Sequence, residues 1–86
     1  MGRYNLLIKP SAVKEIEGIG QKKDRQRVVQ RIQSLADDPR PPACEKLSHH
    51  ERYRVRQGWY RIIYEVDDSL ENILVVKVGH RRDVYR

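Results

Sequence analysis

Arginines recur at alternate positions in the stretch RYRVRQGWYRIIYEV, which begins at Arg52 of this 86-residue chain. Arg54 and Arg56 come next, Arg61 follows, and the first acidic residue downstream is Glu65. The planar, permanently charged guanidinium can donate two hydrogen bonds to one phosphate group. Several such groups around one phosphate would also stabilise the extra negative charge that develops when it is attacked. A single arginine here is typical of a solvated sheet face, but a cluster without an acid among its members indicates phosphate chemistry.

A second cluster, GHRRDVYR at residues 79–86, adds groups that can move protons. His80 can titrate near neutral pH, and Tyr85 offers a hydroxyl that would need activation. Arg81 and Arg82 lie between them. If this last segment follows a strand beside the arginine hairpin, its end comes near the arginines. His80 then becomes a candidate acid or base rather than a surface residue.

Neither cluster is expected to hold a metal or a cofactor. Asp and Glu do not occur in them at the spacing of metal ligands. The side chains of the adjacent His49 and His50 would diverge on a strand, because successive residues point to opposite faces. We therefore interpret both histidines as loop residues.

The arginine stretch itself predicts an antiparallel hairpin with a two-residue loop at Gln57-Gly58, since glycine suits such a turn. This loop would place Arg54 directly opposite Arg61, and like charges in that position destabilise a strand pair. The arginines would share one face of the hairpin. The other face, which can lie on helices, would carry Tyr53, Val55, Tyr60, Ile62, Tyr64 and Val66.

The segment before the hairpin predicts a strand and two helices. Residues 4–8 are apolar and end at Lys9-Pro10, which suits a strand closed by proline. Ser11 can cap a short helix, whose inward-facing residues would be Val13, Ile16 and Ile19. A longer helix over residues 22–36 has one apolar stripe and one basic face. The stripe consists of Val28, Ile32 and Leu35, and the basic face of Lys23, Arg27 and Arg31.

The remaining pattern predicts an α+β fold. The loop DDPRPPA is kept irregular by proline, and CEKL reads as a short edge strand. Strands follow at 53–56, 59–66 and 73–79, and the last is apolar enough to be an inner strand covered on both faces. We expect a strand, a two-helix hairpin and then an antiparallel sheet of three or four strands with the helices on one face. A short C-terminal helical turn would close the chain.

The composition points to a polyanionic partner. Lys and Arg number 18 against 12 Asp and Glu, which gives a formal net charge of +6. Nucleic acid, an acidic protein and an anionic membrane surface all fit this charge. The single cysteine, Cys44, cannot form an internal disulfide, so a reducing cytoplasm is expected. The first ten residues lack the apolar stretch of a signal peptide, and no apolar run is long enough to span a membrane.

The two motifs YRVRQGWYRIIYEV and VGHRRDVYR together resemble the RelE toxins of bacterial and archaeal type II toxin–antitoxin pairs, within the RelE/ParE superfamily. The resemblance covers nearly the whole chain, so we expect one RelE-like toxin domain over residues 1–86. It implies an endoribonuclease, an mRNA interferase that enters the A site of the 70S ribosome and cuts the mRNA there. The ribose 2′-hydroxyl attacks the adjacent phosphate without metal, leaving a cyclic phosphate and a free 5′-hydroxyl.

The resemblance also implies roles for individual residues. Arg54 and Arg56 match two basic strand residues that flank the scissile phosphate. Arg61 and Arg81 match the arginines that clamp this phosphate, and Tyr85 matches a tyrosine that stacks on the RNA or serves as the base. Further contacts with RNA or the ribosome are expected from Arg52, Lys23, Arg27, Arg31 and Arg82.

The chain departs from the best-known RelE members at Arg54 and Arg56, where those proteins have lysines. Arginine holds its proton too tightly to act as an acid or base. The change preserves charge stabilisation but leaves the proton-transfer groups open. His80 and Tyr85 are the better candidates, and the sequence does not choose between them.

The resemblance further implies a cognate RelB-like antitoxin, an acidic and partly disordered chain that folds onto the basic surface. Through the antitoxin, the complex would bind its own promoter DNA. Two alternatives stay open, because a fold does not determine a function. One is a ParE-like toxin that inhibits DNA gyrase without chemistry, and the other is a plain RNA- or ribosome-binding module. The density of Arg, His and Tyr favours mRNA cleavage.

Overall fold

The computed structural model describes residues 3–47 and 51–81. The elements follow the order β1 (Asn5–Ile8), α1 (Pro10–Glu17), α2 (Lys22–Ser34), β2 (Glu45–Leu47), β3 (Arg52–Gln57), β4 (Tyr60–Asp67) and β5 (Asn72–His80). All five strands join one sheet in the order β1-β5-β4-β3-β2. Strand β1 runs parallel to β5, and the other neighbours are antiparallel. The expected C-terminal helical turn lies outside the described residues.

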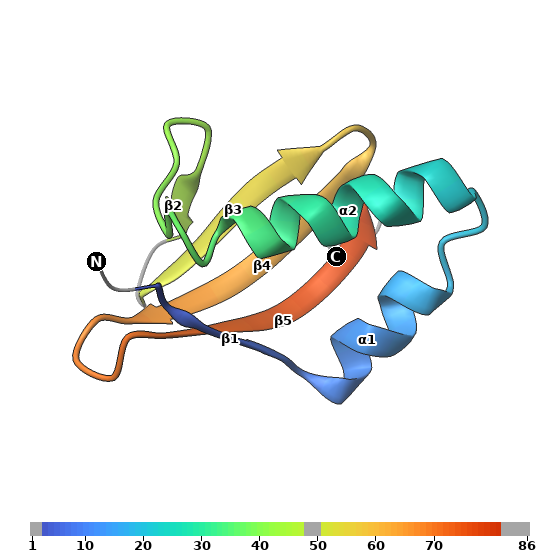
Figure 1. Ribbon diagram of the computed structural model, residues 1–86. Helices are drawn as coiled ribbons and strands as arrows, with labels where there is room; N and C mark the ends of the chain where they lie inside the picture. The colour runs from blue at the N-terminus through green and yellow to red at the C-terminus, as the bar shows by residue number, and fades with distance from the viewer. Residues whose placement is uncertain (1–2, 48–50, 82–86) are drawn as a thin grey trace.

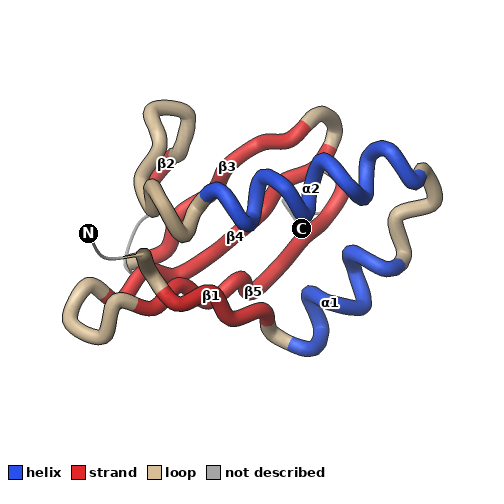
Figure 2. The backbone as a smooth tube through the Cα atoms, viewed as in Figure 1, coloured by secondary structure: helices blue, strands red, loops and turns tan. Residues whose placement is uncertain are grey.

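The α+β class is confirmed and all five predicted strands form, but the first strand joins the antiparallel strands as a parallel fifth member of the sheet. The helices form one layer and the sheet the other, and α2 crosses the face of β3 and β4 (Figure 1). The tube in Figure 2 shows β1 beside β5, and the α1–α2 segment then carries the chain to the opposite edge of the sheet, where β2 lies. Because a long connection separates β1 from β5 in the chain, the two strands can pair in parallel. None of the helices in residues 3–47 and 51–81 is long and apolar enough to cross a membrane.

The core forms between α2 and the sheet. The predicted stripe of Val28, Ile32 and Leu35 is buried, with exposed fractions of 0 to 1%. It belongs to one core cluster with the predicted inner face of the β3–β4 hairpin and with three residues of β5, Ile73, Val75 and Val78. Full burial of one such side chain contributes about 1.5–3 kcal/mol. The stripe therefore fixes which face of the sheet the helices cover.

The start of α1 differs from the prediction. Lys9 occupies the N-cap without a side-chain cap, and Pro10 is the first helical residue. Proline is suited to that position because its missing N–H would have no helical partner there. Ala12 is fully buried and Val13 is 38% exposed, so the inward face is Ala12 with Ile16 rather than Val13. Ile19 is buried as predicted.

The β3–β4 hairpin has the predicted faces but a different loop. Gln57 pairs with Tyr60, so the loop is Gly58-Trp59 rather than Gln57-Gly58. Gly58 takes a φ of 59°, a left-handed conformation that favours glycine at the first loop position. The loop moves by one residue, and Arg61 consequently faces Arg56 instead of Arg54.

Strand β5 has the predicted inner position, between β1 and β4. Its pairing with β1 ends at Val75, and helix α1 covers the next part of the edge. Glu15 accepts a hydrogen bond from the Val78 amide at 3.0 Å and another from Lys77 Nζ at 3.1 Å. One carboxylate on α1 thus holds the strand that leads to His80. The face of β5 away from the helices is only half-buried in the described residues, as Leu74 shows.

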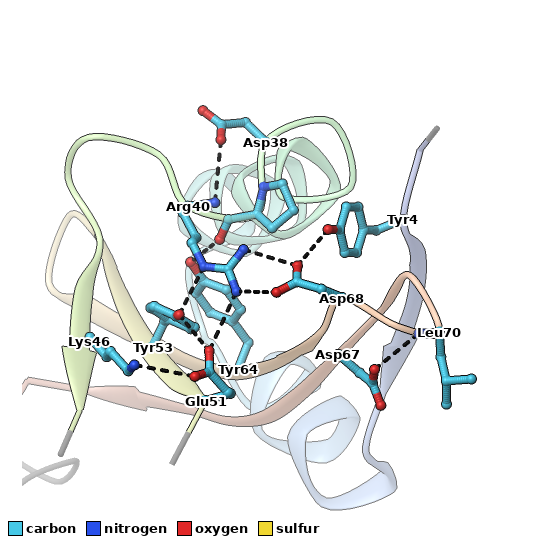
Figure 3. A network of polar contacts seen from close by, with 11 residues as sticks. Tyr4, Asp38, Arg40, Lys46, Glu51, Tyr53, Tyr64, Asp67, Asp68 and Leu70 are labelled. Atoms are coloured by element: carbon cyan, nitrogen blue, oxygen red, sulfur yellow. Dashed lines mark hydrogen bonds and ion pairs between the residues drawn. The ribbon is translucent and has the colours of Figure 1, made fainter. Parts of the chain in front are cut away.

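A polar network ties the proline-rich loop to the far end of the sheet (Figure 3). We call it the Arg40 network, and it consists of Tyr4, Arg40, Glu51, Tyr53 and Asp68. The Arg40 guanidinium donates to both oxygens of Asp68, at 3.1 and 2.8 Å, and to the Tyr53 hydroxyl at 2.9 Å. Tyr4 donates to Asp68 at 2.6 Å, and Tyr53 donates to Glu51 at 2.9 Å. The network therefore joins four separate segments, with Tyr4 linked to Arg40 through Asp68.

These contacts shift the pKa of both carboxyl groups in the direction that keeps them charged. The hydrogen bond from Arg40 holds the pKa of the Asp68 carboxyl below its usual range. The hydrogen bond from Tyr53, followed by that from Lys46, lowers the pKa of Glu51. Below the network, the buried Tyr64 hydroxyl donates to the Pro39 carbonyl at 2.6 Å, and burial raises the pKa of Tyr64. All of these groups keep their neutral-pH charge states.

Candidate active site

The other end of the sheet brings the arginines together. The β3–β4 turn and the end of β5 lie at this end, and the β4–β5 turn lies at the opposite one (Figure 1). In the register of the sheet, Arg56 pairs with Arg61 and Arg61 with Gly79, so two cations stand beside a residue without a side chain. Directly opposed like charges cost stability. We call this region the arginine end, defined by Arg54, Arg56, Trp59, Arg61, His80 and Arg81.

Three of the four strand arginines have carboxylate neighbours, and the expectation of an acid-free face is wrong for them. Arg52 forms an ion pair with Glu65 at 2.5 Å. Arg54 forms one with Glu45 at 2.6 Å, and Arg56 lies 3.9 Å from the same carboxylate. The reason is register. Glu65 lies directly opposite Arg52 on β4, and edge strand β2 places its glutamate opposite Arg54.

Arg61 differs from its neighbours. It is only 7% exposed, yet it forms no ion pair with any residue in the ranges 3–47 and 51–81, and its buried Nε has no hydrogen-bond partner there. Leaving a buried donor without an acceptor costs free energy. Arg61 is therefore the cation of this end that has unused hydrogen-bonding capacity and no ion pair among the described residues.

An aromatic cluster closes the arginine end. The Arg81 guanidinium lies 4.6 Å from the centre of the Trp59 ring, and the Arg81 amide donates to the Trp59 carbonyl at 2.8 Å. The His80 ring stacks near Trp59 at 6.5 Å and meets the Tyr60 ring edge-on at 5.8 Å. The turn and the end of β5 therefore hold each other in place through ring contacts and one backbone bond.

His80 sits beside Arg61 but toward the other side of the sheet. It pairs with Tyr60, whereas Arg61 pairs with Gly79, and successive residues alternate between faces. On its own side it lines a hollow of about 310 Å³ together with Glu15, Gly18, Ile19, Tyr60, Lys77, Val78 and Gly79. A proton carried by His80 would therefore reach a phosphate on Arg61 around the end of the strand and not across the open face.

The structure separates the other basic residues from this cluster. Lys23 and Arg27 are exposed on α2 and Arg31 is half-buried there, in the layer on the opposite side of the sheet. Arg52 lies at the far end of β3, paired with Glu65. Four predicted residues lie outside the described ranges: His49, His50, Arg82 and Tyr85.

Sequence analysis did not predict the roles of Trp59, which belongs to the arginine end, and Glu45, which lies beside it. Glu45 belongs to the correctly predicted edge strand, but only the register with β3 shows that it faces the arginines. Trp59 was placed within a strand, whereas it lies in the turn. Gly58, which suits a positive φ, was the available signal that Trp59 lies in the turn. No local signal in the sequence marks Glu45.

Comparison with known proteins decides the family. A model of the ParE toxins of type II toxin–antitoxin systems, parDE, matches residues 6–85. The chain belongs to this toxin family. Among curated proteins, this ParE-family toxin is similar to Toxin RelG of Mycobacterium tuberculosis, with 38% identity over 34 residues. That match spans only 40% of the chain and 39% of RelG.

Solved structures of RelE toxins share the fold of this ParE-family toxin. The RelE–RelB complex of Pyrococcus horikoshii has a TM-score of 0.83 at 26% identity, covering 95% of this chain and 99% of that one. The isolated RelE toxin of E. coli has a TM-score of 0.78 at 26% identity, covering 95% and 90%. The predicted membership in the RelE/ParE group is confirmed.

Proposed function

We propose that this toxin is a metal-independent endoribonuclease that cuts mRNA in the ribosomal A site in the cytoplasm. The observation that carries the proposal is Arg61, a buried cation whose Nε lacks a partner among the described residues. Arg56 stands directly opposite Arg61 on β3, and Gly79, its partner on β5, has no side chain. A phosphate there would gain charge-assisted hydrogen bonds that are stronger than bonds between neutral groups.

The proposed reaction needs charge stabilisation and two proton transfers. The 2′-oxygen attacks the neighbouring phosphorus, the bond from phosphorus to the 5′-oxygen breaks, and a 2′,3′-cyclic phosphate and a 5′-hydroxyl result. Arg61 and Arg81 would hold the phosphate, and Arg54 and Arg56 would add positive charge around it. Such preorganised donors act most strongly on the charge that develops in the transition state.

One proton leaves the 2′-hydroxyl and one reaches the 5′-oxygen. His80 and Tyr85 are the proposed carriers, with His80 held by rings of Trp59 and Tyr60. The group that transfers a proton in the slow step should flatten one limb of the pH–rate profile when replaced, as in His80→Gln or Tyr85→Phe.

The proposed partner is an acidic, RelB-like antitoxin. Support comes from the +6 charge of the chain and from the Pyrococcus horikoshii relative, which was solved as a RelE–RelB complex. The complex would bind its own promoter DNA through the antitoxin. Co-expression of a neighbouring acidic protein should relieve any growth arrest caused by the toxin.

A second candidate function is inhibition of DNA gyrase, which the match to the ParE family model favours. The two are separated by inducing the toxin alone and examining both nucleic acids. Primer extension should show new 5′ ends within translated mRNA, while plasmid supercoiling by gyrase stays normal. An Arg61→Ala variant expressed at the same level serves as the control. Gyrase-linked DNA breaks with intact mRNA would overturn the proposal in favour of the second candidate.

A further inference from the structure

Trp59, the one tryptophan of the chain, is 57% exposed at the tip of the β3–β4 turn. A tryptophan side chain can bury 150–250 Å² or so of surface and contributes most when it is covered. Trp59 takes no part in the core. The turn does not require it either, because Gly58 supplies the left-handed residue. Its exposure therefore points to a ligand.

The ring is held in a defined orientation. Arg81 covers it at 4.6 Å, the backbone bond from Arg81 joins the two residues, and His80 stacks nearby at 6.5 Å with planes 15° apart. A ring fixed in this way loses little conformational entropy when it binds, which favours affinity. The same contacts join the ring to Arg81, a proposed phosphate ligand.

The position beside the arginines identifies the chemistry of the ligand. Trp59 precedes Arg61 by two residues in the chain, and Arg81, whose guanidinium covers the Trp59 ring, follows Gly79, the β5 partner of Arg61, by two residues. A flat aromatic ring close to the guanidinium groups of Arg61 and Arg81 suits a ligand that carries both a planar base and a phosphate. Single-stranded RNA combines these two features, and base stacking on aromatic rings is its usual mode of recognition.

We propose that Trp59 is the stacking platform for a nucleobase of the RNA strand whose phosphate lies on Arg61 and Arg81. The ligand identity rests on the proposed function, but the stacking role goes beyond it. One base stacked on an aromatic side chain strengthens binding by about 5- to 150-fold. Stacking tolerates every base, so Trp59 is expected to add affinity with weak sequence preference.

Because Trp59 is the only fluorophore of its kind in the chain, its emission reports directly on the platform. The probe is a short RNA with 2′-O-methyl groups, which cannot be cut, and an abasic strand with the same phosphates. The RNA should quench Trp59 in a saturable way, and the abasic strand should bind, by anisotropy of an end label, without quenching. Equal quenching by both strands, or none by either, would overturn the proposal.

Substitutions test the same point through affinity. Trp59→Leu should weaken binding of the RNA by about 5- to 150-fold and binding of the abasic strand less than about 2-fold, whereas Trp59→Tyr should restore most of the loss. The matched control is Leu70→Ala, because Leu70 lies at the opposite end of the sheet and is also exposed, with 66% of its surface accessible. Parental RNA affinity in Trp59→Leu, or equal losses for both strands, would show that Trp59 does not stack on a base.

The binding assay separates this inference from the proposed function. It uses no ribosome and no cleavage, so quenching without mRNA cleavage in cells would overturn the proposed function and support the platform. Cleavage in cells with unchanged RNA binding by Trp59→Leu would overturn the platform alone. Urea unfolding of each variant confirms that the turn still folds, and the quenching of the parent protein needs no variant at all.

Discussion

The two ends of the sheet use arginine in opposite ways. At one end, Arg40 is saturated, with Asp68, Tyr53 and Glu51 accepting from its guanidinium. At the other end, Arg61 is more deeply buried and has no ion pair among the residues that the structure describes. The same side chain thus holds loops together where it is surrounded by acceptors and keeps binding capacity where it is not.

Charge follows the same division. Near the Arg40 network, the face of the sheet away from the helices has a hollow of about 660 Å³ with acidic and apolar lining. Its carboxylates are Glu51, Glu65, Asp67 and Asp68, which would repel a phosphate chain. At the arginine end, Glu45 is the carboxylate within reach of Arg54 and Arg56. The two ends therefore differ in charge, and only the arginine end has the positive charge that the proposed function requires.

The largest expected effect is on catalysis at the arginine end. Arg61→Ala or Arg81→Ala should lower the single-turnover rate of mRNA cleavage on the ribosome by about 10²-fold or more, as for loss of a preorganised charge donor. Affinity for the ribosome should change much less, because other basic residues share that contact. Arg3→Ala, which removes an exposed arginine paired with Asp37, is the matched control and should leave the rate unchanged. If both variants cleave at the parental rate, Arg61 and Arg81 are not part of the active site.

The second effect belongs to the opposite end and acts on stability. Tyr64→Phe leaves the Pro39 carbonyl without its donor, and loss of such a buried bond costs about 1–2 kcal/mol. For a domain of this size each kcal/mol lowers the melting temperature by roughly 4–8 °C. Thermal unfolding followed by circular dichroism measures this shift. Cleavage measured well below the melting temperature should stay at the parental rate. A lower rate would show that the Arg40 end of the sheet also contributes to catalysis.

The third effect is a pH dependence of stability at the Arg40 network. The pKa of Asp68 is held below its usual range, so this carboxylate stabilises the fold above about pH 4 and loses that contribution as pH falls through its folded pKa. Asp68→Asn should therefore be less stable than the parent at pH 7, and the difference should shrink under acid conditions. Urea midpoints between pH 3 and pH 7 check this. A constant difference would mean that the charge of Asp68 is not what matters.

The smallest expected effect concerns Glu45. If its carboxylate is only a counter-ion to Arg54 and Arg56, Glu45→Gln should strengthen binding of non-cleavable RNA by roughly 1.5- to 5-fold, the range expected for an exposed ion pair. Fluorescence anisotropy measures the affinity. A strong fall in cleavage rate instead would identify Glu45 as a proton acceptor in the reaction. That result would move proton transfer away from His80 and Tyr85.

Much of the fold was predictable because its signals are local. The stripe of Val28, Ile32 and Leu35 has helical spacing, and the alternation around Tyr53 and Val55 sets the inner face of the hairpin. The conformational demand of Gly58 moved the turn by one residue, which changed the partner of Arg61 without changing its face. Moving the two-residue loop by one position changes the pairing between the strands by two residues. Two residues are one full period of side-chain alternation, so each side chain keeps its face.

The contacts that give each arginine its role were not predictable, because they join distant segments. Glu45 reaches Arg54 across an edge strand, and Glu15 reaches β5 from helix α1. Arg40 lies in a loop that read only as irregular, yet it binds Asp68, 28 residues further along the chain. Composition indicates how many cations a chain has, but only register and tertiary packing determine which of them are neutralised.

Urea unfolding of Arg61→Met tests most directly whether the arginine end is built for binding rather than for stability. Methionine keeps much of the length of arginine and removes a buried charge that has no ion pair in the described structure. Replacing buried charge by apolar groups is often neutral or stabilising. We expect the free energy of unfolding to equal or exceed that of the parent, with cleavage lost. A decrease of about 3 kcal/mol or more, the loss expected when one partner of a buried ion pair is removed, would contradict the account.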